Sequence, residues 1–215
     1  MADGSDIHVA TARVTRAQVE RAMRAPTGRV RPMGEREDAA PRLRRASVLC
    51  PLVERPGGLS VILTRRSDQL KAHPGQIAFP GGKVDPTDPS PLAAALREAE
   101  EEIGLVRRHV DVTGTLEPYA TGTGFLVTPF VGFVDPRFRP VPEAGEVAEV
   151  FELPMDHMMD PANHRRESVT RSGRTRSFWV IPCGPRRVWG ATAGMLRVLA
   201  ERLAVARGET LETPR

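Results

Sequence analysis

Cysteine is scarce in this chain of 215 residues. Only Cys50 and Cys183 occur, both in apolar neighbourhoods, so we predict buried free thiols rather than a disulfide or a metal site. That usage favours a cytoplasmic protein. Long apolar runs are also missing, and the polar start MADGSDIHVA lacks the apolar core of a signal peptide. The sequence therefore gives no reason to expect a membrane partner.

The excess of charge of one sign is small. Lys and Arg total 31 against 27 for Asp and Glu, a net charge of +4, with Arg far outnumbering Lys. This balance suits an anionic small-molecule substrate but is too diffuse to indicate nucleic-acid binding. A hydrophobic content of 40% is ordinary for a globular core, and the length suits one domain.

Stretches rich in Pro, Gly and Arg divide the chain into three parts. Residues 1–43 are expected to hold a short helix at 15–23 and an Arg- and Pro-rich arm. The arm is interpreted as a solvated segment, with contact to substrate phosphates or to a second subunit as the alternative. Residues 44–206 are expected to form the folded domain, and residues 207–215 a tail.

Strand-like runs lie on both sides of a central helix. Residues 46–53 and 59–64 are separated by ERPGG, which predicts a hairpin. Pro51 places its strand at an edge or a bulge. Further strands are expected at 110–115, 125–134 and 174–182, and a terminal helix at 189–206 with its N-cap near Thr192. This order predicts an α/β sandwich with a mixed sheet.

The central helix has a clear start and end. Ser90 is a favourable N-cap, Pro91 suits the first helical position, and Gly104 can end the helix in a left-handed conformation. Its apolar stripe consists of Leu92, Leu96, Ala99 and Ile103.

Three carboxylates share a different face of this helix. Glu98, Glu101 and Glu102 stand at i, i+3 and i+4, so they project together. Grouped oxygen ligands of this kind suit a hard divalent cation such as Mg²⁺ or Mn²⁺. The alternative is a solvated helix face, but Arg97 and the preceding Gly81-Gly82 turn favour a site.

The stretch FPGGKVDPTDPSPLAAALREAEEEIGL resembles the Nudix box, G-x5-E-x7-R-E-U-x-E-E-x-G-U, where U is aliphatic. Its second half matches from Arg97 to Leu105. In the first half, Asp88 stands where Glu is expected, and Arg97 falls one residue late. The loop from Lys83 to Ser90 therefore carries an insertion relative to the box.

Residues 62–82 (ILTRRSDQLKAHPGQIAFPGG) resemble the coenzyme A pyrophosphatase branch of Nudix hydrolases, L-L-T-x-R-[SA]-x3-R-x3-G-x3-F-P-G-G. Lys71 stands where the second Arg is expected, which keeps the charge without the bidentate fork. We expect Arg66 and Lys71 to contact the 3′-phosphate of coenzyme A. The substrate-binding residues implied are Arg66, Ser67, Lys71, His73, Gly75, Gly81 and Gly82, with His73 in a secondary role.

The resemblance implies a Nudix-type α/β/α sandwich and hydrolysis of a nucleoside diphosphate linked to another moiety. Mg²⁺ or Mn²⁺ held by the three helix glutamates would activate water. Arg97 and Gly104 would be structural. A glutamate outside the box often assists catalysis in this family, and Glu146 is our choice over its neighbours Glu143 and Glu149.

Three functions stay open from the sequence. The first is a coenzyme A pyrophosphatase that releases 3′,5′-ADP and 4′-phosphopantetheine. The second is a Nudix hydrolase of another nucleoside diphosphate derivative, such as ADP-ribose, NADH or a damaged nucleoside triphosphate. The third is a non-catalytic binding module, which ranks last because such modules usually lose box carboxylates. A homodimer is also left open.

Overall fold

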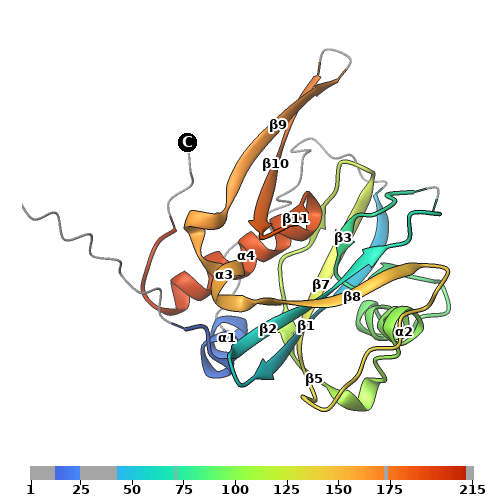
Figure 1. The fold of residues 1–215 in the computed structure, drawn as a ribbon, viewed down its shortest axis with the longest axis horizontal. Helices are drawn as coiled ribbons and strands as arrows, with labels where there is room; N and C mark the ends of the chain where they lie inside the picture. Colours follow the sequence, from blue (N-terminus) through green and yellow to red (C-terminus); the bar gives the residue numbers. More distant parts are fainter. Residues whose placement is uncertain (1–12, 25–42, 71, 172–173, 212–215) are drawn as a thin grey trace, which may run out of the picture.

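The computed structural model describes residues 13–24, 43–70, 72–171 and 174–211. Within these ranges the chain forms a large mixed sheet, a smaller antiparallel sheet and four α-helices (Figure 1). The predicted α/β/α sandwich with a mixed sheet is confirmed. No helix in the described part of the chain combines the length and the apolar character needed to cross a membrane.

The helices are α1 (Arg16–Arg24), α2 (Pro91–Ile103), α3 (Met155–Met159) and α4 (Ala191–Ala206), with short 3₁₀ turns at Arg107–His109 and Pro161–Asn163. The strands of the large sheet are β1 (Arg44–Arg55), β2 (Gly58–Arg66), β3 (Ile77–Ala78), β4 (Gly81–Lys83), β5 (Val110–Thr115), β6 (Tyr119–Ala120), β7 (Phe125–Val134) and β8 (Val147–Pro154). Those of the small sheet are β9 (Arg165–Arg171), β10 (Arg174–Cys183) and β11 (Arg186–Trp189).

The large sheet has the order β3-β2-β1-β7-β5, and β4, β6 and β8 pair with β1, β7 and β2 respectively. Strands β1 and β7 are parallel, whereas the other pairs are antiparallel. The predicted hairpin of β1 and β2 turns between Arg55 and Gly58, which pair directly.

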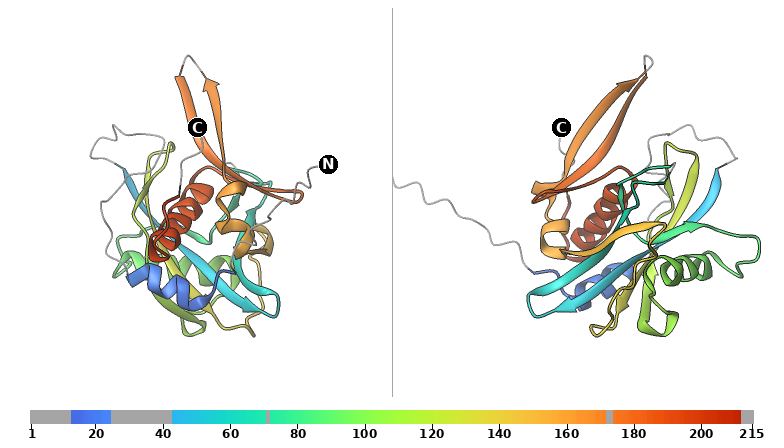
Figure 2. Two further views of the ribbon diagram at one scale, coloured as in Figure 1. Left: turned by 90° about the vertical axis from the view of Figure 1, so that its left-hand side faces the viewer. Right: turned by 45° about the vertical axis from the view of Figure 1, so that its right-hand side comes forward.

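Both faces of the large sheet are covered, so its central strands are apolar without alternation. Along β1, Leu49 and Val53 pack on the face covered by α2, where they meet Ile103. Cys50 and Leu52 point to the opposite face, into the core shared with α1, α3 and α4. The two helical layers are visible on either side of the sheet in Figure 2.

Pro51 does not mark an edge strand, because β1 lies in the interior of the sheet. On one side β1 pairs with β4 through Ala46–Val48 and with β2 through Leu52–Arg55, and Pro51 lies between these stretches. The Leu49 N–H donates to the Pro80 carbonyl on that side. By alternation, the N–H that Pro51 lacks would point the same way, into the break in the ladder.

The C-terminal part differs from the sequence prediction. Strand β10 is confirmed, but β9 and β11 were not predicted, and the hairpin of β9 and β10 projects from the body (Figures 1 and 2). Trp189 pairs with Val180 in β11 instead of starting the helix. The N-cap is Gly190 at φ +65°, not Thr192, whose hydroxyl donates to the Ile77 carbonyl.

Helix α1 packs against α4 and β5, and its Val19 and Ala22 are fully buried in the larger core. The division at residue 44 stays a prediction, and the arm at 25–42 lies outside the described residues. Both cysteines are free thiols. Cys50 is buried, which raises the pKa of its thiol, whereas Cys183 is only half-buried, contrary to the prediction.

Candidate active site

The ends of α2 follow the sequence prediction. The Ser90 hydroxyl accepts the Ala93 N–H at 3.1 Å. Gly104 adopts φ +70°, and its N–H donates to the Glu100 carbonyl at 2.9 Å. Because Ile103 is buried against the sheet, the rotation of the helix is fixed, and two of its glutamates face the short strand β4.

The two glycines of β4 allow a close approach of backbone and carboxylates. At Gly81, with φ +150°, an added Cβ would lie 2.4 Å from the Ser47 carbonyl oxygen in β1. At Gly82, a Cβ would lie 2.5 Å from the Glu98 carboxylate. A side chain at Gly81 would therefore separate β4 from β1, and one at Gly82 would displace the Glu98 carboxylate.

Glu102 is the most buried carboxylate of the box, with 5% of its surface exposed. One of its oxygens accepts the Gly81 N–H at 3.2 Å. Burial raises the pKa of Glu102 to about 7, and the negative charges of Glu98 and Glu146 add to the effect, against the Gly81 N–H and Arg66.

Glu98 is half-buried beside it. Burial raises the pKa of Glu98 above its usual value, and the charges of Glu101 and Glu146 act in the same direction, while Arg97 opposes them. Glu98, Glu102 and Glu146 therefore repel one another across a short distance. This is an arrangement that a bound cation would relieve.

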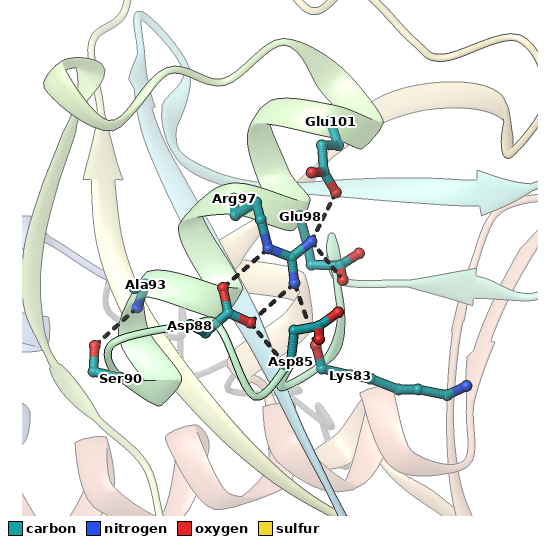
Figure 3. A network of polar contacts seen from close by, with 8 residues as sticks. All are labelled: Lys83, Asp85, Asp88, Ser90, Ala93, Arg97, Glu98 and Glu101. Atoms are coloured by element: carbon teal, nitrogen blue, oxygen red, sulfur yellow. Dashed lines mark hydrogen bonds and ion pairs between the residues drawn. The ribbon is translucent and has the colours of Figure 1, made fainter.

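Arg97 organises the other side of α2 (Figure 3). Its guanidinium binds both Asp88 oxygens, at 3.0 and 3.1 Å, which lowers the pKa of Asp88. The same group contacts Glu101 at 2.8 Å and Glu98 at 3.1 Å. Asp88 also accepts the Asp85 N–H at 2.7 Å. The inserted loop at 83–90 is therefore held against α2 by the two hydrogen bonds between Arg97 and Asp88.

The sequence analysis missed Asp88 as the partner of Arg97. The available signal was its place in the box, where the pattern expects Glu. A carboxylate at that position faces a basic residue about two helical turns into α2, so the pairing could have been proposed.

The three glutamates near β8 have different surroundings. Glu149 forms a bidentate salt bridge with Arg186, at 2.6 and 2.9 Å. The Glu143 carboxylate accepts the backbone N–H of Glu146 at 2.8 Å. Glu146 is exposed and close enough to Glu98 and Glu102 to raise the pKa of both. Of the three, Glu146 therefore faces the box carboxylates.

The loop that carries Glu146 is anchored at both ends. The Glu143 N–H donates to the Glu102 carbonyl at 2.9 Å, at the end of α2. The Ser67 N–H donates to the Glu146 carbonyl at 2.8 Å. The register between β2 and β8 shifts beside this point, between Arg65 and Arg66. Such bulges are frequent next to active sites, where they redirect side chains.

The segment 62–82 places its predicted residues in different surroundings. Ser67 is buried, and its hydroxyl accepts the Gln69 N–H at 3.3 Å. Gly75, at φ +67°, lines a neighbouring cavity with Arg65 and Arg186. Neither Ser67 nor Gly75 reaches the box carboxylates, and Lys71 lies outside the described residues.

A cavity of about 330 Å³ opens beside Glu102. Arg66, His73 and Gly81 line the same cavity, so four predicted site residues meet there. The Nε atom of Arg66 is buried and makes no hydrogen bond within the described part of the chain. The cavity therefore offers a cation directly beside the carboxylate cluster.

The carboxylates of the box decide whether this site could bind a metal ion. Within the described ranges, no three His, Cys, Asp or Glu side chains stand close enough to form a ready-made metal site. Glu101 points to Arg97 and is 58% exposed on its side chain. The donors nevertheless fit a hard divalent cation, because Glu98 and Glu102 are carboxylates whose pKa values are raised by burial and further by neighbouring negative charges.

The fold and this carboxylate cluster define a class of enzyme. Residues 43–173 match the family model of the NUDIX domain, so the chain belongs to the Nudix family. It is a Nudix hydrolase, an enzyme that cleaves phosphoric anhydride bonds. Nudix hydrolases generally use divalent metal ions.

Two relatives indicate the branch of the Nudix family to which the chain is most similar. The chain is 42% identical to the Nudix hydrolase NudL of Enterobacter sp. (strain 638) over 164 residues, which cover 75% of this chain and 84% of that protein. It is 48% identical to the mouse peroxisomal coenzyme A diphosphatase NUDT7 over 128 residues, 60% of this chain and 54% of that protein. The resemblance to the coenzyme A pyrophosphatase branch is confirmed.

Among solved structures, a NUDIX hydrolase from Alicyclobacillus acidocaldarius matches with a TM-score of 0.51 at 19% identity. The match covers 75% of this chain and 93% of that protein. At this identity the likeness supports the fold alone.

Proposed function

We propose that the protein hydrolyses the pyrophosphate bond of coenzyme A or its derivatives. The products would be 3′,5′-ADP and 4′-phosphopantetheine, or its acyl form. The observation that carries the proposal is the position of Arg66, from the branch-specific segment, in the cavity wall beside Glu102. The 48% identity with the mouse coenzyme A diphosphatase supports it.

Glu98, Glu101 and Glu102 would hold Mg²⁺ or Mn²⁺ in this proposal. The divalent ion supplies positive charge for the pyrophosphate oxygens and lowers the pKa of water. Arg97 would orient Glu98 and Glu101, which it contacts at 3.1 and 2.8 Å. Asp88 would hold the Arg97 guanidinium in place through two hydrogen bonds.

Glu146 is the proposed acceptor of the proton from the attacking water. It is exposed, so it can reach water, and its backbone is held on both sides by Ser67 and Glu143. Arg66 would bind a pyrophosphate oxygen, because its charge already acts on Glu102.

A substrate panel tests the proposal. Coenzyme A, ADP-ribose, NADH and 8-oxo-dGTP are incubated with the protein and Mg²⁺ or Mn²⁺, and kcat/KM is measured for each. We expect coenzyme A to be cleaved with the highest kcat/KM, at the pyrophosphate. Faster turnover of ADP-ribose or NADH than of coenzyme A would overturn the assignment.

Substitutions of two basic residues test which phosphate groups of the substrate each residue contacts. For Arg66 a proposed pyrophosphate contact replaces the 3′-phosphate contact expected from the sequence, because Arg66 lines the cavity beside Glu102. Arg66→Ala should therefore raise KM for coenzyme A and for dephospho-coenzyme A alike. Lys71→Ala should raise KM for coenzyme A alone if Lys71 contacts the 3′-phosphate, as the sequence predicts. A charge-assisted contact is worth roughly 1.5–3 kcal/mol, which corresponds to about tenfold or more in KM. Equal effects of Lys71→Ala on both substrates would remove that role.

The cytoplasmic location and the homodimer stay proposals from the sequence. Size-exclusion chromatography with light scattering would measure the oligomeric state.

A further inference from the structure

The cavity beside Glu102 has two walls of different origin. One wall comes from the segment at 62–82 and from α2. The second wall, called the far wall here, is formed by Tyr119, Thr121, Gly122, Thr123, Trp189, Gly190, Ala191, Thr192 and Met195. Its members from β11 and α4 follow residue 173, the last residue of the family match. The far wall is therefore built largely by a part of the chain that the shared domain does not include.

Charge is unevenly distributed around this cavity. Its acidic and basic lining residues are Arg66 and His73, from the segment at 62–82, and Glu102, from α2. The lining residues of the far wall are uncharged and include the apolar or aromatic side chains of Tyr119 and Met195. A phosphate group would lose its hydration there without gaining a cationic partner. The far wall thus suits an uncharged part of a substrate.

The far wall also offers hydrogen-bond donors. The N-cap of α4 is Gly190, and no side chain among the described residues caps the helix. The first N–H groups of a helix have no acceptor within it, so those at the start of α4 are available to carbonyl oxygens. The part of the cavity along the far wall, called the slot here, is apolar and has a few backbone donors. Such a slot fits a flexible ligand chain that contains amide groups.

From these observations we infer that the far wall binds the pantetheine arm of the substrate. This inference rests on the proposed function, since it assigns the two halves of coenzyme A to different regions. The pyrophosphate would lie between Arg66 and the box carboxylates. The uncharged arm, with its two amides and its thiol or thioester end, would run along Met195 and Trp189. The nucleoside 3′-phosphate would stay outside the far wall.

Ala191 offers a clean test of the slot. It is the first residue of α4, is half-buried and lines the cavity, so the larger side chain of Ala191→Phe would occupy part of the slot. Ala206 is the matched control, because it is also half-buried and ends the same helix away from the cavity. Circular dichroism and thermal unfolding would verify that both Phe variants fold.

Gly194 supplies a second variant that narrows the slot indirectly. An added Cβ at Gly194 would lie 2.5 Å from the ring of Tyr119, which lines the cavity. Gly194→Ala should therefore displace the ring without placing a new group in the slot itself. It keeps the test decisive if Ala191→Phe fails to fold.

The experiment measures inhibition of coenzyme A hydrolysis by each of the two products separately. We expect Ala191→Phe to raise the inhibition constant of 4′-phosphopantetheine at least tenfold and to leave that of 3′,5′-ADP within twofold. Gly194→Ala should act in the same direction, and Ala206→Phe should change neither constant. Equal changes for the two products, a larger change for 3′,5′-ADP, or no change for either would overturn the inference.

Failure of the proposed function would look different. If the unmodified protein does not cleave coenzyme A, both the function and this assignment are wrong. If it cleaves coenzyme A while the variants do not distinguish the products, only the assignment of the far wall is wrong.

Discussion

Glu101 and Glu102 are neighbours in the sequence, but the fold places them in opposite electrostatic situations. Glu101 is exposed and paired with Arg97 at 2.8 Å. Glu102 is buried, accepts one N–H from Gly81, and faces Glu98 and Glu146, which raise its pKa. One side of α2 is therefore neutralised within the protein, whereas the other keeps an uncompensated negative charge. Perturbed carboxylates of this kind are characteristic of functional sites.

The largest expected effect is on turnover. Glu102→Gln and Glu101→Gln should each lower kcat by ~10²-fold or more while the fold is kept, because each removes a charged ligand. Steady-state kinetics with saturating Mn²⁺ measures this, and circular dichroism checks the fold. Turnover close to normal in both variants would contradict the metal assignment.

Glu146→Gln should lower kcat by ~10-fold or more with little change in KM, because a proton acceptor acts mainly in the transition state. Glu149→Gln is the matched control from the same region. It weakens the salt bridge with Arg186 and should leave kcat within about twofold. If Glu149→Gln is the more damaging change, Glu146 is the wrong choice.

A smaller effect is expected at Glu143, whose carboxylate holds the Glu146 N–H at 2.8 Å. Glu143→Ala removes the acceptor and should lower kcat by ~2- to 10-fold, the range that one hydrogen bond accounts for. Glu143→Gln keeps an acceptor oxygen and should retain most of the activity. Equal losses in the two variants would show that the charge of Glu143, not its hydrogen bond, matters.

The smallest effect concerns the cap of α2. Ser90→Ala removes the acceptor for the Ala93 N–H and should cost about 1 kcal/mol of stability, or ~2–4 °C in Tm. Thermal unfolding measures this. Since Ser90 contacts none of the box carboxylates, kcat should stay within about twofold, and a large loss of kcat would contradict its role as a cap alone.

Features of the fold that depend on local chemistry were predicted well. Ser90 and Gly104 define both ends of α2, because capping involves residues within one or two turns. The strands at 110–115 and 125–134 were also confirmed, since their apolar runs lie between turn residues. The edge alternative for Pro51 and the helical position of Trp189 were wrong, because both positions depend on strand partners distant in sequence.

The site shows the same limit. Spacing on one helix brought Glu98, Glu101 and Glu102 together in the prediction, but it could not separate the buried Glu102 from the exposed Glu101. That difference depends on β4, which packs against the helix after folding. Nor could the sequence distinguish Glu146 from Glu149, because the partner Arg186 is 37 residues away.

The difference between the two sides of α2 can be tested most directly by stability in the presence and absence of metal. The folded-state pKa of Glu102, about 7, lies above its ordinary value of 4.5. Without metal, the contribution of Glu102 to stability should therefore fall by ~3 kcal/mol as the pH rises from about 4.5 through about 7, and Glu102→Gln should remove this part of the pH dependence.

The deciding measurement is Tm at pH 8, in EDTA and in Mn²⁺, for the unmodified protein and for Glu102→Gln. In EDTA the Gln variant should unfold at the higher temperature, because it has no buried charge at this position. Addition of Mn²⁺ should raise the Tm of the unmodified protein more than that of the Gln variant, because only the unmodified protein retains the charged ligand at position 102. The account would be contradicted if the Gln variant had a lower Tm than the unmodified protein in EDTA and if Mn²⁺ raised the Tm of both proteins equally.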